Sequence, residues 1–230
     1  ESQRILADKV LAVGKPTVIV LLAGSSVDLG PAADKAGAVL LGWYPGAMGG
    51  KAISEILFGK VSPSGKLPVT FYHQSDLYLM PEFTDYGMKG RTYRYVGFRP
   101  LYPFGDGLTS SKVGVCDASW KRTEGGIEVR VTAENSGKVF TEDVVQVYAQ
   151  NEGSANAPDN PRLVAFGRVS LDAGQKAEVK LTVSDDSLLV VNGKGVHVME
   201  GKVVLYVGTC QPDAYSRMLS GTDVIRMEVL

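Results

Sequence analysis

The sequence predicts two fold classes in one chain: a partial parallel α/β sandwich, followed by an all-β, immunoglobulin-like sandwich. Continuous apolar runs of strand length alternate with helix-like spacing before residue 110, and apolar residues recur at every second position after it. A stretch rich in Tyr, Gly and Pro that follows neither pattern separates the two. We therefore expect an α/β region over residues 1–72, a connecting arm over 73–110 and a β region over 111–230.

Helix-like and strand-like segments alternate in the first 72 residues. Apolar residues from Ser2 to Val13 recur at helix spacing until Gly14 ends the pattern. The run from Thr17 to Leu22 is continuously apolar, which is typical of a strand buried on both faces. The alternation predicts a parallel sheet wound by right-handed crossovers. The expected helices cover residues 2–13, 31–35 and 51–58, and the expected strands cover residues 17–22, 38–41 and 67–72.

A period of two governs the second half of the chain. Ile127, Val129 and Val131 alternate with charged residues, and residues 145–148, 179–183 and 203–207 repeat the pattern. Turn residues such as Asn192-Gly193 separate these runs, so we expect a sandwich of about seven strands. No helical period occurs in this half, and the polar stretch from Asn151 to Pro161 predicts a long loop.

Composition argues against several classes of function. The 230 residues are 44% hydrophobic and 21% charged, as in globular proteins, and the longest apolar stretch is too short to cross a membrane. A net charge of −1 without a basic cluster argues against nucleic acid as a partner. Two Cys and two His, far apart in sequence, are too few for a structural zinc site, so neither a metal nor a cofactor is expected. We expect Cys116 and Cys210 to be buried free thiols, with a disulfide as the open alternative.

Several motifs occur in a fixed order along the chain. Tyr44–Ile53 and Ser62–Phe71 come first, Gly90–Tyr95 and Leu101–Leu108 follow, and Asp143–Tyr148 and Pro161–Phe166 lie in the β half. Together they resemble the C-terminal part of glycoside hydrolase family 3, of β-xylosidase or β-glucosidase type. The resemblance implies the end of the family's α/β sandwich domain, then a fibronectin type III domain. It covers nearly the whole chain, although Ala47-Met48 and Asp106 depart from the usual pattern.

The same resemblance implies an enzyme whose catalytic groups lie elsewhere. Family members are retaining exo-β-glycosidases, and glycoside hydrolysis requires two carboxyl groups roughly 5–10 Å apart. The nucleophile belongs to an N-terminal (β/α)8 barrel that is missing here. The acid/base segment is expected just before residue 1, because Glu1-Ser2-Gln3 resembles the tail of the stretch that follows it. The implied partners are that barrel, the remainder of the α/β domain and a β-linked oligosaccharide or aryl glycoside, and the chain alone should be inactive.

The arm contains the candidate substrate-binding residues. Aromatic, carboxylate and guanidinium groups are concentrated between Met80 and Tyr95, and sugar recognition uses aromatic faces and charged planar groups. Glu82, Asp85, Tyr86 and Arg91 are therefore candidate substrate contacts. The competing interpretation is that the arm only packs against the barrel, and solvated loop charges remain the ordinary explanation for carboxylates of this kind. We expect no catalytic residue in the chain.

A second class of function is a stand-alone carbohydrate-binding or adhesion module built on the β-sandwich. Such a module predicts a row of exposed aromatic residues on the β half. Few aromatic residues occur there, and several lie at positions compatible with an inward orientation, which argues against this alternative.

In the α/β region, a glycine-rich phosphate loop is also disfavoured, because Gly46–Gly50 lacks the required Lys-Ser/Thr order. The partial sheet leaves an open edge, so we expect the isolated chain to aggregate or to form a homodimer.

Overall fold

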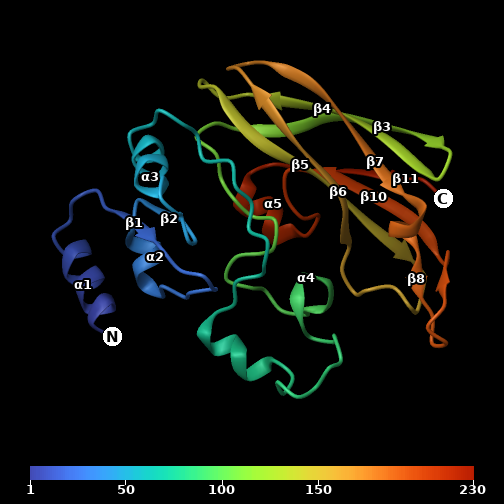
Figure 1. Cartoon of the computed structure of the whole chain (residues 1–230), viewed down its shortest axis with the longest axis horizontal. Coiled ribbons are helices and arrows are strands. Elements are labelled where there is room, and N and C mark those ends of the chain that lie inside the picture. The colour runs from blue at the N-terminus through green and yellow to red at the C-terminus, as the bar shows by residue number, and fades with distance from the viewer.

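The structure is a computed structural model that describes all residues from 1 to 230. An α/β region and a β-sandwich lie at opposite ends, with the arm between and below them (Figure 1). The α/β region contains α1 (Ser2–Leu11), β1 (Val18–Leu21), α2 (Pro31–Lys35), β2 (Ala38–Leu41) and α3 (Gly49–Leu57). Pro31 lies at the start of α2, where its missing N–H is not needed. None of the helices is long and apolar enough to cross a membrane.

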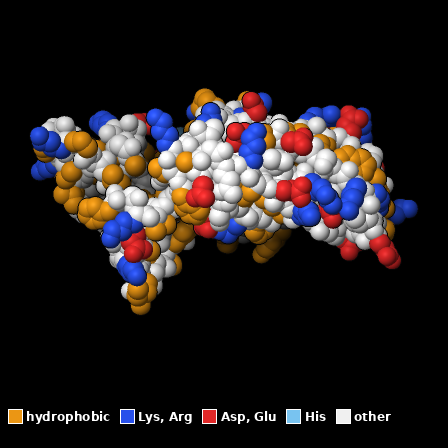
Figure 2. All heavy atoms as spheres, turned by 90° about the horizontal axis from the view of Figure 1, so that it is seen from above, with side chains coloured by type: hydrophobic (Ala, Val, Ile, Leu, Met, Phe, Trp, Pro, Cys, Tyr) orange, Lys and Arg blue, Asp and Glu red, His pale blue; other side chains and the backbone are white.

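Strands β1 and β2 form a two-stranded parallel sheet, as the alternating pattern predicts. Their burial differs from the prediction, because Val18, Val20 and Leu22 are 47%, 37% and 57% exposed. A strand with this composition is normally covered on both faces. Here one face of β1 has no covering layer. Apolar side chains accordingly gather on the surface at the left end of the molecule (Figure 2).

The third strand expected over residues 67–72 does not form. A single antiparallel bridge joins Phe71 to Tyr102, and Leu67 exchanges hydrogen bonds with Gly105 and Asp106. Pro68 lacks the N–H that a continuous ladder would need at that position. This segment therefore pairs with the end of the arm instead of joining the parallel sheet.

Two antiparallel sheets make up the β region and confirm the predicted sandwich. Their strand orders are β11-β10-β5-β6 and β3-β4-β7, with a separate hairpin β8–β9. Seventeen buried residues, most of them Val and Leu, form the core between the sheets. The strands are β3 (Val113–Thr123), β4 (Gly126–Asn135), β5 (Thr141–Glu152), β6 (Arg162–Leu171), β7 (Lys176–Ser184), β8 (Val190–Val191), β9 (His197–Val198), β10 (Lys202–Gly208) and β11 (Ile225–Glu228).

A short helix in the β region contradicts the expectation of no helix there. Helix α5 (Ala214–Ser220) begins after Asp213, whose carboxylate accepts a hydrogen bond from the Ser216 N–H at 2.9 Å. It ends at Gly221, which adopts a φ of 66° in the left-handed region. Seven residues are too few for a helical period to be recognised, although both capping residues can be read in the sequence.

Strand β5 is buried on both faces, whereas its alternating pattern predicts one solvated face. Gln146 and Tyr148 point away from the sandwich core, and they are only 2% and 0% exposed. The arm covers them: Gln146 Nε2 donates to the Gly105 carbonyl at 3.0 Å, and the Tyr93 ring meets Tyr148 edge-on at 6.4 Å. A side chain at Gly105 would lie 2.5 Å from Gln146 Oε1, so glycine is required at this contact.

Neither cysteine forms a disulfide, and only one of them is buried. Cys210 is 2% exposed, and burial raises the pKa of its thiol. Cys116 is exposed, contrary to the expectation that both thiols are buried. It lies at the point where the β3–β4 register shifts, between Val115 and Asp117, and a bulge of this kind changes the direction in which a side chain points.

Candidate functional site

The arm is an irregular segment with two short helical turns, η1 (Gln74–Leu79) and α4 (Thr92–Tyr95). Its first turn is fixed by Asp28, which follows β1: one carboxylate oxygen accepts from the Gln74 N–H at 2.9 Å and the other from the Gly30 N–H at 2.7 Å. Burial is the largest single effect on the pKa of Asp28 and raises it. These two hydrogen bonds and the charges of His73 and Arg4 outweigh burial, so the pKa is lowered overall.

Arg91 closes the loop that carries the other three candidate residues. Its Nη2 donates to the carbonyl oxygens of Pro81, Glu82 and Asp85 at 3.3, 2.7 and 3.0 Å. The Asp85 carboxylate accepts from the Gly87 N–H at 2.8 Å, which tightens the following turn. The structure thus brings Glu82, Asp85, Tyr86 and Arg91 into one small loop. It does so mainly through the backbone, and Arg91 Nε and Nη1 donate to no protein group.

Aromatic rings on this loop and next to it are almost completely exposed to solvent. Tyr78, Phe83 and Tyr86 are 90%, 93% and 95% exposed. Rings of this size normally bury most of their surface in a protein core or an interface. The carboxylates of Glu82 and Asp85 form no ion pair, so the loop presents ring faces beside free hydrogen-bond acceptors. This combination is suited to contacts with a sugar or to packing against another protein surface.

The chain contains no carboxyl pair that the structure marks as catalytic. Asp28 uses both of its oxygens to hold backbone N–H groups, and Asp34 lies in the first turn of α2. No group of three or more His, Cys, Asp or Glu side chains could hold a metal ion. We therefore assign no catalytic role to Asp28 or Asp34.

The contact between the arm and the β region depends on residues that sequence reasoning did not single out. Asn160 Nδ2 donates to the carbonyls of Tyr93 and Val96 at 2.9 and 3.0 Å, and the Asn160 N–H donates to Arg94 O at 3.0 Å. The Tyr93 hydroxyl accepts from the Leu163 N–H at 3.0 Å. The only sequence signal was the polar character of the loop that contains Asn160. A loop side chain with two N–H donors is well suited to hold a turn of the arm.

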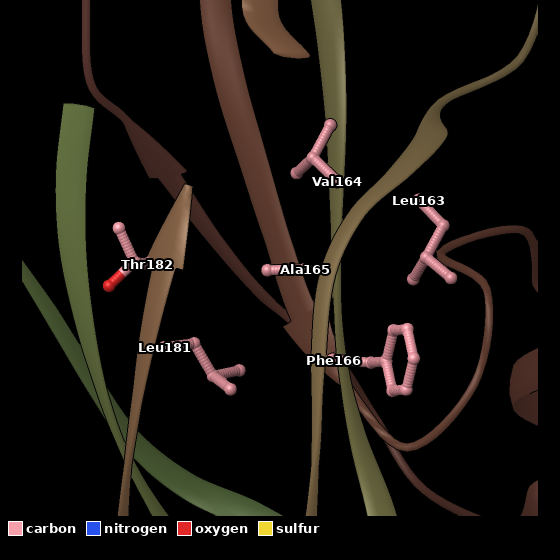
Figure 3. A pocket seen from close by; sticks show the side chains of 6 residues that line it. All are labelled: Leu163, Val164, Ala165, Phe166, Leu181 and Thr182. Carbon is pink, nitrogen blue, oxygen red and sulfur yellow. The ribbon is translucent and has the colours of Figure 1, made fainter. Parts of the chain in front are cut away.

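The surface of the β region gives little support for a stand-alone sugar-binding module. Trp120 on β3 and Phe166 on β6 are 39% and 66% exposed, but they belong to different sheets and form no row. Figure 3 shows a shallow apolar depression between β6 and β7, in which Ala165 and Leu181 face each other across the gap and Phe166 points to the other side of β6. No charged side chain lines this depression.

Comparisons with known proteins assign both parts of the chain. Residues 1–110 match the glycosyl hydrolase family 3 C-terminal domain, and residues 143–211 match the fibronectin type III-like domain. A xylan 1,4-β-xylosidase of Xylanibacter ruminicola is 33% identical over 96% of this chain, which covers 26% of that enzyme. A periplasmic β-glucosidase of Salmonella typhimurium is 30% identical over 90% of this chain, which covers 29% of that enzyme.

A solved structure shows the same arrangement. The crystal structure of DesR, a β-glucosidase from Streptomyces venezuelae, in complex with D-glucose, matches the whole of this chain with a TM-score of 0.83 and 29% identity. The match covers 31% of that enzyme, so this chain spans between a quarter and a third of the relatives that it resembles. The chain therefore carries a glycosyl hydrolase family 3 C-terminal domain, followed by a fibronectin type III-like domain.

Proposed function

We propose that this chain is the C-terminal portion of a retaining exo-β-glycosidase that removes xylose or glucose from the non-reducing ends of β-linked substrates. The main support is that nearly the whole chain is similar to β-xylosidases and β-glucosidases while covering 26% and 29% of the two curated relatives. The motif between Pro81 and Tyr95 resembles that of β-xylosidase-like members of the family more than that of β-glucosidases. The chain divides into the α/β region (1–72), the arm (73–110) and the β region (111–230).

The catalytic carboxyl groups are supplied by a partner, a (β/α)8 barrel together with the rest of the α/β domain. Retaining hydrolysis needs a nucleophile and an acid/base about 5–5.5 Å apart, and no carboxylates of this chain form such a site. The uncovered face of β1 is the surface on which the missing part of the α/β domain would pack. The chain alone is inactive for this reason.

The arm contributes to substrate binding beside the barrel. Tyr86 offers a ring face to the C–H groups of a sugar, and the carboxylates of Glu82 and Asp85 accept hydrogen bonds from its hydroxyls. Arg91 holds the loop in shape through three carbonyl groups, and its free Nε and Nη1 can donate to a sugar oxygen. The exposure of Tyr86 and the absence of ion pairs at Glu82 and Asp85 support this role.

A chimera tests the proposal. The segment of the Xylanibacter xylan 1,4-β-xylosidase that aligns with this chain would be replaced by residues 1–230, and hydrolysis of p-nitrophenyl β-xyloside and β-glucoside would be measured. We expect activity from the chimera, and none from either the isolated chain or the relative truncated before the segment. A soluble, folded chimera without activity would contradict the proposal, as would turnover by the isolated chain that persists through repeated purification.

A further inference from the structure

The loop of residues 81–91 makes no hydrogen bond to the rest of the protein. The three carbonyl groups that Arg91 binds belong to the loop itself, as does the turn at Asp85. Residues 82–89 are all exposed, including Met88, which lines a cavity together with α4. With η1 the loop protrudes at the lower edge of the molecule (Figure 1). The direction in which its side chains point therefore depends chiefly on the segments at its two ends.

The two ends of the loop are anchored to different regions of the protein. Before the loop, η1 is fixed to the α/β region, because the Asp28 carboxylate accepts a hydrogen bond from the Gln74 N–H at 2.9 Å. After the loop, α4 is fixed to the β region through Asn160. The orientation of the loop thus depends on both anchors, and one of them lies in a region that offers no catalytic group.

Asn160 makes three hydrogen bonds to this single turn of the arm. Its Nδ2 donates to the carbonyls of Tyr93 and Val96 at 2.9 and 3.0 Å, and its backbone N–H donates to the Arg94 carbonyl at 3.0 Å. The Tyr93 ring also stacks on Phe104, with the ring centres 4.1 Å apart. Few donors outside the arm could replace the Asn160 amide, because the two carbonyls need two N–H groups from one position.

Thr92 connects this anchor to the loop. It lies between Arg91, which closes the loop, and Tyr93, which is held against the β region, and its φ is 55°. This conformation is very unfavourable for a β-branched residue and persists only where neighbouring contacts impose it. The contacts of Asn160 on one side and of Arg91 on the other impose it here. Release of α4 would let Thr92 return to an ordinary φ, and the loop would then turn.

We propose that Asn160 is a positioning residue for the substrate loop. By holding α4, it fixes the direction in which the side chains of the loop face a bound sugar. This role rests on the proposed function, in which Glu82, Asp85 and Tyr86 contact the substrate. Asn160 acts through α4 and Thr92 and does not touch the sugar, so its loss affects substrate binding and not the chemical step.

Kinetics of the chimera test this role. Asn160→Ala should raise KM for p-nitrophenyl β-xyloside about tenfold and leave kcat within about twofold, because the loop serves binding and the catalytic carboxyl groups lie outside this chain. Asn156→Ala is the matched control: Asn156 is exposed in the same loop of the β region, and its Nδ2 donates only to the Glu200 carboxylate. KM should not change in the control. An unchanged KM in Asn160→Ala, or a fall in kcat alone, would overturn the proposal.

A double-mutant cycle shows whether Asn160 acts through the loop. Once Tyr86→Ala has removed the ring that contacts the sugar, Asn160→Ala should have little further effect. The double variant should therefore lose nearer tenfold than a hundredfold in kcat/KM, well below the product of the two single effects. Single effects that multiply would overturn the proposal, because Asn160 would then act by a route other than the loop.

Proteolysis of the 230-residue chain separates this proposal from the glycosidase function. Trypsin cuts after Lys89 in the loop and after Arg94 in α4, at rates set by the fraction of molecules in which these segments are released. Asn160→Ala should speed both cuts about tenfold, since it removes two hydrogen bonds, and Asn156→Ala should not. Faster cuts together with an inactive chimera would support the hold of Asn160 on the loop and contradict the glycosidase function alone. Equal cleavage rates in Asn160→Ala and the parent would overturn the proposal whatever the chimera's activity.

Discussion

Lys66 and Asp143 form a buried ion pair that joins the α/β region to strand β5. The Lys66 Nζ lies 2.9 Å from Asp143 Oδ1, with 11% and 5% of the two side chains exposed. The same ammonium group donates to the Gly107 carbonyl at 2.6 Å, so it also holds the end of the arm. Burial raises the pKa of Asp143, and the opposing attraction of Lys66 only reduces the effect. Such a pair fixes geometry more than it adds net stability.

We expect Lys66→Met to destabilise the chain by about 3–5 kcal/mol, because it leaves the Asp143 carboxylate buried without a counter-charge. The double variant Lys66→Met with Asp143→Leu should recover much of the loss, since no unpaired charge remains. Lys51→Met is the control: its pair with Glu55 is long, at 4.0 Å, and exposed, so its effect should stay below about 0.5 kcal/mol. Urea unfolding of the four proteins measures these differences. Equal effects for Lys66→Met and Lys51→Met would contradict the prediction.

The burial of Asp106 should make the free energy of unfolding fall as pH rises, which is the opposite of the usual effect of a carboxyl group. Burial raises the pKa of its carboxyl group above the usual value, and the Gly107 N–H and Lys66 compensate only in part. Between the unfolded and the raised folded pKa, the folded state binds more protons, so this carboxyl group lowers stability as pH rises. Asp106→Asn should therefore raise the free energy of unfolding at pH 8 by an amount on the order of 1 kcal/mol. At pH 3 the variant and the parent should unfold alike. A variant less stable than the parent at pH 8 would show that the charged form is favoured.

The arm gives two variants with different expected phenotypes in the full-length enzyme. Tyr86→Ala removes a side chain that is 95% exposed, so Tm should not change, while kcat/KM should fall about tenfold if the ring contacts substrate. Arg91→Ala removes three hydrogen bonds to carbonyl groups and should lower stability by about 1–3 kcal/mol. Arg91→Lys should restore part of that loss. Unchanged kcat/KM in Tyr86→Ala would assign the loop to interface packing.

Local patterns were sufficient to predict most of the fold. Helix α2 and strand β2 have the predicted bounds, because a proline at the helix start and a short apolar run are local signals. The second buried face of β5 could not be predicted, since the groups that cover Gln146 and Tyr148 lie 41 and 55 residues earlier in the chain. In the same way, the sequence pointed to the loop of Glu82–Arg91 as a group. It could not indicate that Arg91 binds carbonyls, because that depends on how the loop folds back.

The two cysteines should differ strongly in reactivity. Cys116 is exposed, whereas Cys210 is 2% exposed with a raised pKa that keeps its thiol protonated. Ellman's reagent should therefore titrate one thiol in the native chain and two after denaturation. Cys116→Ser should abolish the native signal and Cys210→Ser should leave it intact. Two fast thiols in the native chain would show that the region around Cys210 opens easily.

The uncovered face of β1 predicts self-association of the chain. Val18, Val20 and Leu22 alternate along the strand and so share one face, and all three are exposed. The two-stranded sheet also leaves both of its edges unpaired. We expect dimers or larger species in light scattering, driven by the burial of this face against a second copy.

Leu22→Lys tests this prediction, because it places a charge on the uncovered face. It should shift the chain toward the monomer, and the free energy of unfolding should change by no more than about 0.5 kcal/mol at this largely exposed position. Leu230→Lys is the matched control, since Leu230 is 47% exposed at the far end of the β region. A parent chain that is monomeric at every concentration would contradict the prediction. So would equal shifts in the two variants, because the association would then not depend on β1.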